Sequence, residues 1–363
     1  MPALSILAFV LLLIGAPAAQ QAVPPAQDAR VGWNALNAGK LEEASAAFDR
    51  ALRGAPQDGS VLFAAGLTAH LRGQPETARR YLLDALKYDP KLMPASTLLS
   101  DILYRENDIN GAIAVLEQAL VYSPDASPIL SRLEGWRKEA ELHDRFGQKL
   151  GDHFTVLFEG PAEAQLAAKA VAVLEAAYWR IGGALYTYPT GLITVVLYTR
   201  EQFRDVTQSP EWAGGLYDGR IRMPVRGALE NMREFERVLT HEFTHALIHS
   251  LAPSGVPLWL GEGLAVNFEG TDINARAAEL KQAESRPSLR SLEGSFRQLD
   301  TKAAKLAYAQ SAVAVQVLLQ EAGASGVVGI LTEIGRGASF AEAFQRHTGM
   351  SYEEFQKRLD GVV

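Results

Sequence analysis

Two histidines and a glutamate stand at a spacing that favours metal chemistry. Residues 241–245 read His-Glu-Phe-Thr-His, within a segment expected to be helical over about 229–251. Residues four apart share one face of a helix, so His241 and His245 can direct two imidazole nitrogens at one Zn2+ ion. Glu242 then stands beside the metal, where its carboxylate can take a proton from a zinc-bound water and return it to a leaving amine. A chance match in such a chain has odds of about one in a hundred, so we interpret the pattern as a zinc motif.

A glutamate downstream supplies a third ligand of a type that zinc binds. Glu262 lies in the segment 259–265, whose apolar residues predict a second helix. The loop at 252–257 contains two prolines and a glycine, which end the first helix and let the chain turn back. We therefore predict that His241, His245 and Glu262 hold one Zn2+ per chain.

Other polar residues near the motif have weaker claims. His249 lies one turn beyond His245, but three ligands in a row on one helix would strain the geometry. Asp272 follows in a loop, where aspartate usually caps or turns the chain, with a role beside the metal as the alternative. Four further histidines have no partner at ligand spacing and are expected to be surface or core side chains: His70, His143, His153 and His347.

The segments before the motif predict an α+β domain beginning near residue 150. Strand-like runs at 153–158 and 192–198 flank an alanine-rich helix at 162–181. A third run at 220–225 alternates arginine with apolar residues after a glycine-rich turn, so we expect an edge strand there. An extended peptide can add to such an edge by main-chain hydrogen bonds, and an ordinary solvated edge fits the pattern equally well.

At these residues the chain resembles the gluzincin metallopeptidases, and in particular the peptidase MA-like domain found in bacterial proteins beside tetratricopeptide repeats. The resemblance covers most of residues 150–363 and implies a zincin-like α+β fold. It implies that His241, His245 and Glu262 bind zinc and that Glu242 is the catalytic base. Sixteen residues separate His245 from Glu262, slightly fewer than in the best-known gluzincins.

Two further segments invite the same comparison. Tyr308 lies in Ala-Tyr-Ala-Gln-Ser at 307–311 and is similar to the residue that donates a hydrogen bond to the oxyanion in the family; a packing tyrosine with a satisfied hydroxyl is the alternative. Residues 227–231 resemble the amine-binding motif of zinc aminopeptidases. Only nine residues separate Asn231 from His241, too few for a strand to end and a new helix to begin, so we expect a helix start instead.

The N-terminal part of the chain repeats itself every 34 residues. Matching positions carry small residues, then a large apolar residue, and then a proline that ends each unit. The register is clearest in these sets: Gly32, Gly66 and Ser100; Ala44, Ala78 and Ala112; Phe48, Leu82 and Leu116; Pro56, Pro90 and Pro124. The pattern predicts two helices per unit and resembles three tetratricopeptide repeats over 25–126, an all-α solenoid. An amphipathic segment within 127–149 is expected to form a capping helix followed by a linker.

The first nineteen residues predict export. A short apolar run precedes small residues at a possible cleavage site, and the run is too short to span a bilayer comfortably. We interpret residues 1–19 as a signal peptide, with a weak N-terminal anchor as the alternative, and expect no stable membrane span after cleavage. The bacterial periplasm is the expected location, with secretion or N-terminal anchoring also open.

Composition excludes several other classes of protein. Of the 363 residues, 48% are hydrophobic and 21% charged, enough apolar content for two folded domains rather than a disordered chain. The net charge is −7 and the basic residues are not clustered, so nucleic acid is not an expected partner. The chain has no cysteine, which excludes disulfides, thiolate nucleophiles and cysteine-ligated metals.

These observations predict an exported zinc metallopeptidase that hydrolyses peptide bonds in a protein or peptide substrate. Without a convincing amine-binding motif, an endopeptidase is favoured over an aminopeptidase. The repeats would recruit a protein partner or the substrate. The alternative is a non-catalytic scaffold or assembly factor whose peptidase fold is a relic or a structural zinc module. Such a relic would be expected to lose Glu242 first, because only catalysis needs the base.

Overall fold

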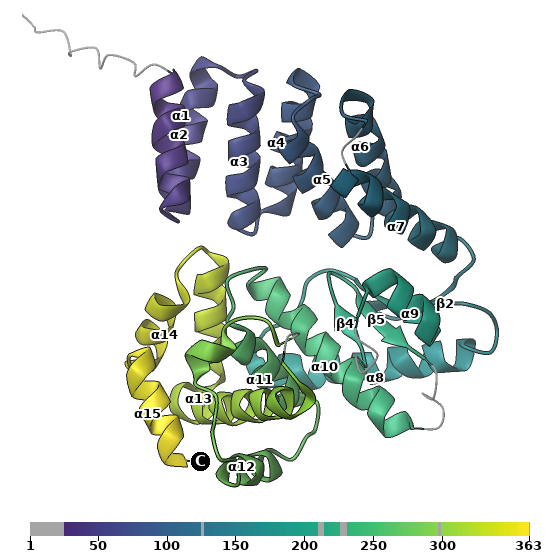
Figure 1. The fold of residues 1–363 in the computed structure, drawn as a ribbon, viewed down its shortest axis with the longest axis vertical. Helices are drawn as coiled ribbons and strands as arrows, with labels where there is room; N and C mark the ends of the chain where they lie inside the picture. Colours follow the sequence, from purple (N-terminus) through teal and green to yellow (C-terminus); the bar gives the residue numbers. More distant parts are fainter. Residues whose placement is uncertain (1–24, 125–126, 210–213, 226–230, 297–298, 363) are drawn as a thin grey trace, which may run out of the picture.

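The N-terminal part of the chain folds into paired helices. The computed structural model describes residues 25–124, 127–209, 214–225, 231–296 and 299–362. The expected signal segment lies outside the described residues. In the first described range the helices form three antiparallel pairs that stand side by side (Figure 1). Their bounds are α1 Pro25–Asn37, α2 Leu41–Gly54, α3 Gly59–Leu71, α4 Pro75–Tyr88, α5 Met93–Arg105 and α6 Ile109–Tyr122.

The 34-residue sequence period recurs in the helix bounds. The first helices of the pairs begin at residues 25, 59 and 93, and the second at 41, 75 and 109. Between the helices of each pair, Gly39, Gly73 and Asn107 adopt φ values of 71°, 67° and 69°, a left-handed turn that glycine and asparagine tolerate best. The helices approach closely at the small positions, since a Cβ on Gly32 would meet the Phe48 ring at 2.6 Å. The predicted helix pairs are therefore present.

A seventh helix, α7 (Ser127–His143), packs against α6 and leads into a mixed sheet. Within the described residues the sheet has five strands: β1 (Gly147–Leu150), β2 (Phe154–Phe158), β3 (Ile193–Tyr198), β4 (Leu216–Tyr217) and β5 (Ile221–Pro224). The order is β1-β2-β3-β5-β4, with the central pairs parallel and the outer pairs antiparallel. The register aligns Phe154 with Ile193 and Val195 with Ile221.

The expectation of an edge strand at 220–225 is wrong. Strand β5 pairs with β3 on one side and with the short β4 on the other, so β4 is the edge. The arginines that suggested a solvated strand are instead buried, with 1% and 0% of the side chains of Arg220 and Arg222 exposed. Both donate to the Glu139 carboxylate of α7, at 2.9 and 2.7 Å. Asp218 pairs with Arg222 as well, at 2.9 Å, so two carboxylates balance the two arginines and the cations are tolerated in the interior.

This buried charge cluster joins the N-terminal helices to the sheet. Arg222 donates to the hydroxyls of Tyr104 on α5 and Tyr198 on β3, both at 2.8 Å. The Tyr104 hydroxyl in turn donates to Glu139, and Arg220 donates to the Tyr104 backbone carbonyl. Side chains from α5, α7, β3 and β5 therefore meet in one hydrogen-bonded network, which fixes the helical region against the sheet.

Helices cover the sheet and extend beyond it. The remaining elements are α8 (Ala164–Leu185), α9 (Arg200–Thr207), α10 (Met232–Leu251), α11 (Leu258–Phe268), α12 (Ile273–Lys281), the 3-10 turn η1 (Leu289–Leu292), α13 (Thr301–Gly335), α14 (Phe340–Thr348) and α15 (Tyr352–Val362). One core forms where α8 and α10 pack on the sheet. A second core joins α11 and α13 to α14 and α15. Helices α10 and α11 are adjacent, so the two cores meet at this pair (Figure 1).

Helix α13 is the one described helix whose length and apolar composition match those of a membrane span, and its backbone leaves helical geometry at Gly323 (φ 67°, ψ 176°). An 18-residue window of α13 has a mean hydropathy of 1.4, and 44% of this window is buried inside the fold. Residues such as Val315, Leu318 and Leu331 are packed in the second core. Burial against α11 and α14 therefore accounts for the apolar character of α13.

Candidate metal centre

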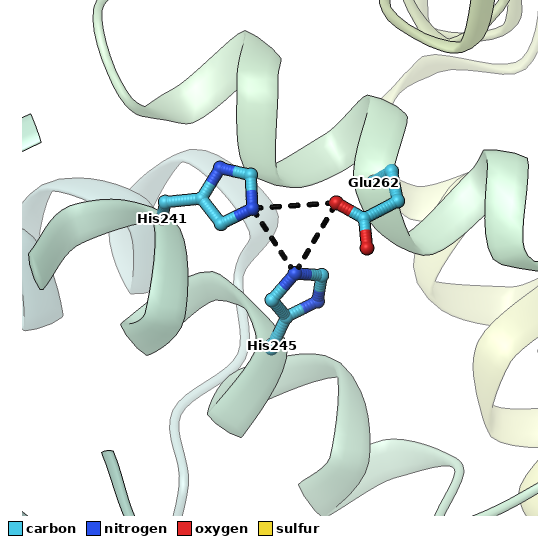
Figure 2. Close-up of side chains that lie close together, drawn as sticks. All are labelled: His241, His245 and Glu262. Atoms are coloured by element: carbon cyan, nitrogen blue, oxygen red, sulfur yellow. Dashed lines mark hydrogen bonds and ion pairs between the residues drawn. The ribbon is translucent and has the colours of Figure 1, made fainter. Parts of the chain in front are cut away.

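Helices α10 and α11 bring the three predicted ligands together. His241 and His245 lie one turn apart on α10, and Glu262 reaches them from α11 (Figure 2). The two Nε2 atoms are 3.2 Å apart, and the Glu262 Oε2 atom lies 3.3 Å from that of His241 and 3.6 Å from that of His245. Three potential ligand atoms thus converge on one point, although 16 residues separate the second histidine from the glutamate.

The donor set fits a zinc ion. Two imidazole nitrogens and one carboxylate oxygen are the ligands that catalytic zinc sites often use, with a further position left for water or substrate. The Glu262 Oε2 atom is buried and has no hydrogen-bond partner among the described residues. A buried carboxylate oxygen without a donor is costly, and a cation among these three atoms would satisfy it. Because the Glu262 oxygen has no hydrogen-bond donor, a Zn2+ ion would satisfy these three atoms better than their contacts with one another do.

A residue that the sequence did not single out orients one of the ligands. Glu269 follows α11, and its Oε2 atom accepts a hydrogen bond from His241 Nδ1 at 2.7 Å. The same oxygen accepts from Arg237 at 2.6 Å, and the other oxygen accepts from the Thr271 hydroxyl. With Nδ1 holding the proton, Nε2 of His241 is left to face Glu262.

A signal for Glu269 was present in the sequence. Glu262 and Glu269 are seven residues apart, which is two helical turns, so they share a face of the α11 segment. Asp272, the weaker acidic candidate, instead caps α12, with its side chain accepting from the backbone N–H groups of Asn274 and Ala275. The capping interpretation of Asp272 is therefore confirmed.

The electrostatic field at this point favours positive charge. Burial by itself would lower the pKa of His241, but the neighbouring carboxylates of Glu262 and Glu269 outweigh it and raise the pKa to about 10. Burial likewise opposes ionisation of Glu262, yet the two histidines hold its pKa well below the ordinary value. The carboxylates that retain a proton on His241 would retain a metal cation in the same way.

Glu242 lies beside the three ligands without pairing to them. Its side chain is buried, and burial raises the pKa of its carboxyl, a condition that makes a carboxylate a stronger base. Its carboxylate packs against Gly215, where an added Cβ would lie 3.0 Å from Oε1 and 2.9 Å from Cγ. Gly215 directly precedes the edge strand β4, so the backbone near that edge passes close to Glu242.

Two cavities open from this point. One has a volume of about 440 Å³ and is lined by the three ligands, Glu242, the loop before α11 and β4. The other has a volume of about 480 Å³ and lies toward α12 and the start of α13. Both are lined by Gly215, His241, Glu242 and Tyr308, so both cavities reach Glu242 and one of the ligands.

Tyr308 lines both cavities. It lies on α13, its side chain is partly buried, and its ring packs edge-on against Phe296 at a centroid distance of 5.4 Å. Burial, followed by the charges of Glu262 and Glu242, raises the pKa of the Tyr308 hydroxyl, which keeps it protonated and able to donate. Packing against Phe296 and lining of the cavity coexist, so the two interpretations of this residue do not exclude each other.

The remaining candidates do not belong to the ligand cluster, although His249 lines the cavity of about 440 Å³. The His249 ring contacts Tyr217 at 5.5 Å, and burial and then Arg105 lower the pKa of His249. Asn231 caps α10, with its side chain accepting from the Glu234 backbone N–H; residues 227–230 of the aminopeptidase-like segment lie outside the described residues. Three other histidines pair with nearby polar groups: His143 with Tyr198, His153 with Glu175, and His347 with Glu333.

Comparison with known proteins identifies the family. Residues 182–363, half of the chain, match the sequence model of the Peptidase MA superfamily. The chain belongs to this superfamily. The matched region includes α10, α11 and α13, the elements that carry the histidine and glutamate cluster.

A shorter similarity links the chain to a much longer protein. A stretch of 60 residues is 50% identical to the cellulose synthase operon protein C of Komagataeibacter xylinus. The stretch covers 16% of this chain and 5% of that protein, so the chain spans only a small part of this relative.

Proposed function

We propose that this protein is an exported, zinc-dependent peptidase of the gluzincin type. The observation that carries the proposal is the meeting of two histidines and a glutamate around one point, with a buried glutamate beside them that lines two cavities. Membership of the Peptidase MA superfamily supports the same chemistry. Export rests on the signal-peptide pattern of residues 1–19.

In this proposal each residue has a distinct task. His241, His245 and Glu262 hold the ion, and Glu269 keeps His241 in the orientation that presents Nε2. A bound Zn2+ supplies a Lewis acid that polarises the scissile carbonyl and makes water a stronger nucleophile.

Proton transfer is assigned to Glu242 and oxyanion binding to Tyr308. The Glu242 carboxylate accepts the proton of the attacking water and passes it to the nitrogen of the leaving amine. The protonated Tyr308 hydroxyl donates to the oxygen that becomes negatively charged. The low solvent access around both side chains strengthens these interactions.

The shape of the site favours internal cleavage of a chain. An exopeptidase needs a closed end and groups that bind a free terminus. Here two cavities of about 440 and 480 Å³ share the Glu242 side chain in their walls. The edge strand β4 lines the first of them and offers main-chain groups to an extended peptide. We therefore infer an endopeptidase.

The N-terminal helices are proposed to be tetratricopeptide repeats that recruit the substrate or a partner protein. Helix pairs with a 34-residue period stack into a surface of the kind that binds peptides. The buried network around Glu139 and Arg222 holds this surface in a fixed position relative to the cleft. A substrate bound by the repeats would thus meet the cleft in a restricted orientation.

Hydrolysis of blocked peptides tests the proposed reaction. A mixture of unstructured peptides with acetylated N-termini and amidated C-termini is incubated with the zinc-loaded protein, and products are identified by mass spectrometry. Internal cleavage that a chelator abolishes and added zinc restores is the expected result. A non-catalytic scaffold with a structural zinc site would bind zinc and leave every peptide intact.

A further inference from the structure

One end of the cleft differs in charge from the other. The cavity of about 440 Å³ has no lysine or arginine among the described residues that line it, and apolar groups such as Ile248, Val256 and Phe296 form much of its wall. The cavity of about 480 Å³ is lined by three cations, Arg237, Arg276 and Lys305, and by the carboxylates of Glu234, Glu242 and Glu269. A peptide that occupies both cavities would therefore meet a largely apolar wall in the first and a wall with cations of its own in the second.

The cationic residues occupy the helical turns next to the site. Arg237 precedes His241 by one turn on α10, and Lys305 precedes Tyr308 by about one turn on α13. Arg276 enters from the first turn of α12. All three line the cavity that Glu242 and Tyr308 also line. A substrate group bound by these cations would therefore lie in the same cavity as the proposed catalytic side chains.

The three cations differ in how fully carboxylates neutralise them. The charge of Arg237 is fully neutralised, because it donates to both oxygens of Glu234 and to Glu269, at 2.8, 2.6 and 2.6 Å. Arg276 and Lys305 instead share one carboxylate, that of Glu279, at 3.3 and 3.0 Å. Glu279 does not line the cavity among the described residues. Two cations that share one carboxylate leave one positive charge for an incoming anion.

We propose that Arg276 and Lys305 form a subsite for a carboxylate of the substrate. This assignment rests on the proposed peptidase function and narrows it to peptides with a carboxylate on the α12 side of the scissile bond and apolar residues on the other side. The carboxylate is that of an Asp or Glu side chain, because internal cleavage leaves peptide chain on both sides of the scissile bond. A preference for a free C-terminus alone would overturn this assignment. Arg276 is the less exposed partner, with 30% of its side chain exposed against 61% for Lys305.

Binding to a catalytically silent protein tests the subsite apart from hydrolysis. Fluorescently labelled peptides are titrated into the full-length Glu242→Gln protein loaded with zinc, and the dissociation constant is read by anisotropy. The peptides share an apolar sequence and carry, at successive positions, one Glu or one Gln. A second series keeps Gln throughout and compares a free C-terminal carboxylate with an amide.

The expected result is binding about threefold to tenfold tighter for one position of Glu than for Gln at that position, with no preference for the free terminus. The preference should weaken as salt rises, because part of it is a screened charge interaction. It should disappear in the Arg276→Gln/Lys305→Gln protein. Lys281→Gln is the matched control, because Lys281 is an exposed cation of α12 that does not line the cavity, and it should retain the preference.

Two results would overturn the subsite. Equal affinity for charged and neutral peptides at every position would show that no carboxylate is recognised. A preference that survives in the double variant would show that other groups recognise it. Failure of every peptide to bind would contradict the peptidase proposal and the subsite together, whereas binding without a charge preference contradicts the subsite alone.

Discussion

The Nδ1 atom of His241 lies 2.7 Å from Oε2 of Glu269, and this contact fixes which imidazole nitrogen faces the ligand cluster. Glu269 is itself held by Arg237 and Thr271, and only 2% of its side chain is exposed. His241 is thus oriented by a carboxylate that is rigid and charged, which raises the affinity of its other nitrogen for a cation.

Glu269→Gln should lower zinc affinity by about tenfold to a hundredfold, because the amide still accepts the hydrogen bond but lacks the negative charge. Competition with a fluorescent zinc chelator measures the affinity. Glu234→Gln is the control, since Glu234 also pairs with Arg237 but is exposed and does not contact His241. If both variants and the unchanged protein bind zinc with equal affinity, Glu269 does not contribute to zinc binding.

Glu242→Gln should abolish most hydrolysis while zinc binding and folding persist. Removal of a general base typically costs about a hundredfold to ten-thousandfold in rate. Peptide cleavage followed by mass spectrometry gives the rate, and circular dichroism checks the fold. Glu236→Gln, an exposed change on the same helix, should keep full activity. A Glu242→Gln protein that cleaves at the original rate would mean that another group accepts the proton.

Arg222→Met should destabilise the protein by about 3–5 kcal/mol, because Glu139 would keep its burial and lose one of its two arginines. Urea unfolding followed by circular dichroism measures the change. Arg137→Met breaks an exposed ion pair with Glu117 and should cost no more than about 1 kcal/mol. Similar small losses in both variants would show that the buried network does not hold the two regions together.

Acid should destabilise the protein in a window set by His143. Burial is the main cause that lowers the pKa of His143 to about 4. The Glu139 carboxylate opposes this shift, and the positive charges of Arg220 and Arg222 add to it. Between about pH 6.5 and pH 4, His143 binds a proton in the unfolded chain but stays neutral in the folded protein. The unfolded state therefore binds more protons, and the free energy of unfolding falls as the pH falls, by at most about 3 kcal/mol.

A His143→Gln protein separates this effect from other titrating groups. Unfolding in urea is followed across that window for both proteins. The variant should lose less stability between its two ends, whatever its stability at neutral pH. Equal losses would indicate that His143 titrates alike in the folded and unfolded chains.

Local periodicity explains why much of the fold could be predicted. The 34-residue register of residues such as Phe48 and Leu82 reflects contacts within and between neighbouring helices, which the sequence displays directly. The convergence of His241 and His245 follows from one helical turn. Glu262 required only that a second helix return to the first, which the prolines and glycine of the intervening loop allow.

Contacts distant in sequence could not be predicted in the same way. Arg220 and Arg222 alternate with apolar residues as on a solvated edge, and their burial depends on Glu139, more than 80 residues earlier. The sequence did not predict that β4 lies at the edge, because a two-residue strand carries too little pattern to be recognised. The cationic end of the cleft joins Arg276 and Lys305 from separate helices, which only tertiary structure brings together.

The zinc content of the purified protein tests the central claim most directly. Elemental mass spectrometry is applied to the protein after zinc loading and removal of free metal, beside Glu262→Ala and, as a control, Glu236→Ala. We expect about one zinc per chain in the unchanged protein and in the control, and a large loss in Glu262→Ala. Absence of zinc from the unchanged protein after loading, or full retention in Glu262→Ala, would contradict a metal centre built from His241, His245 and Glu262.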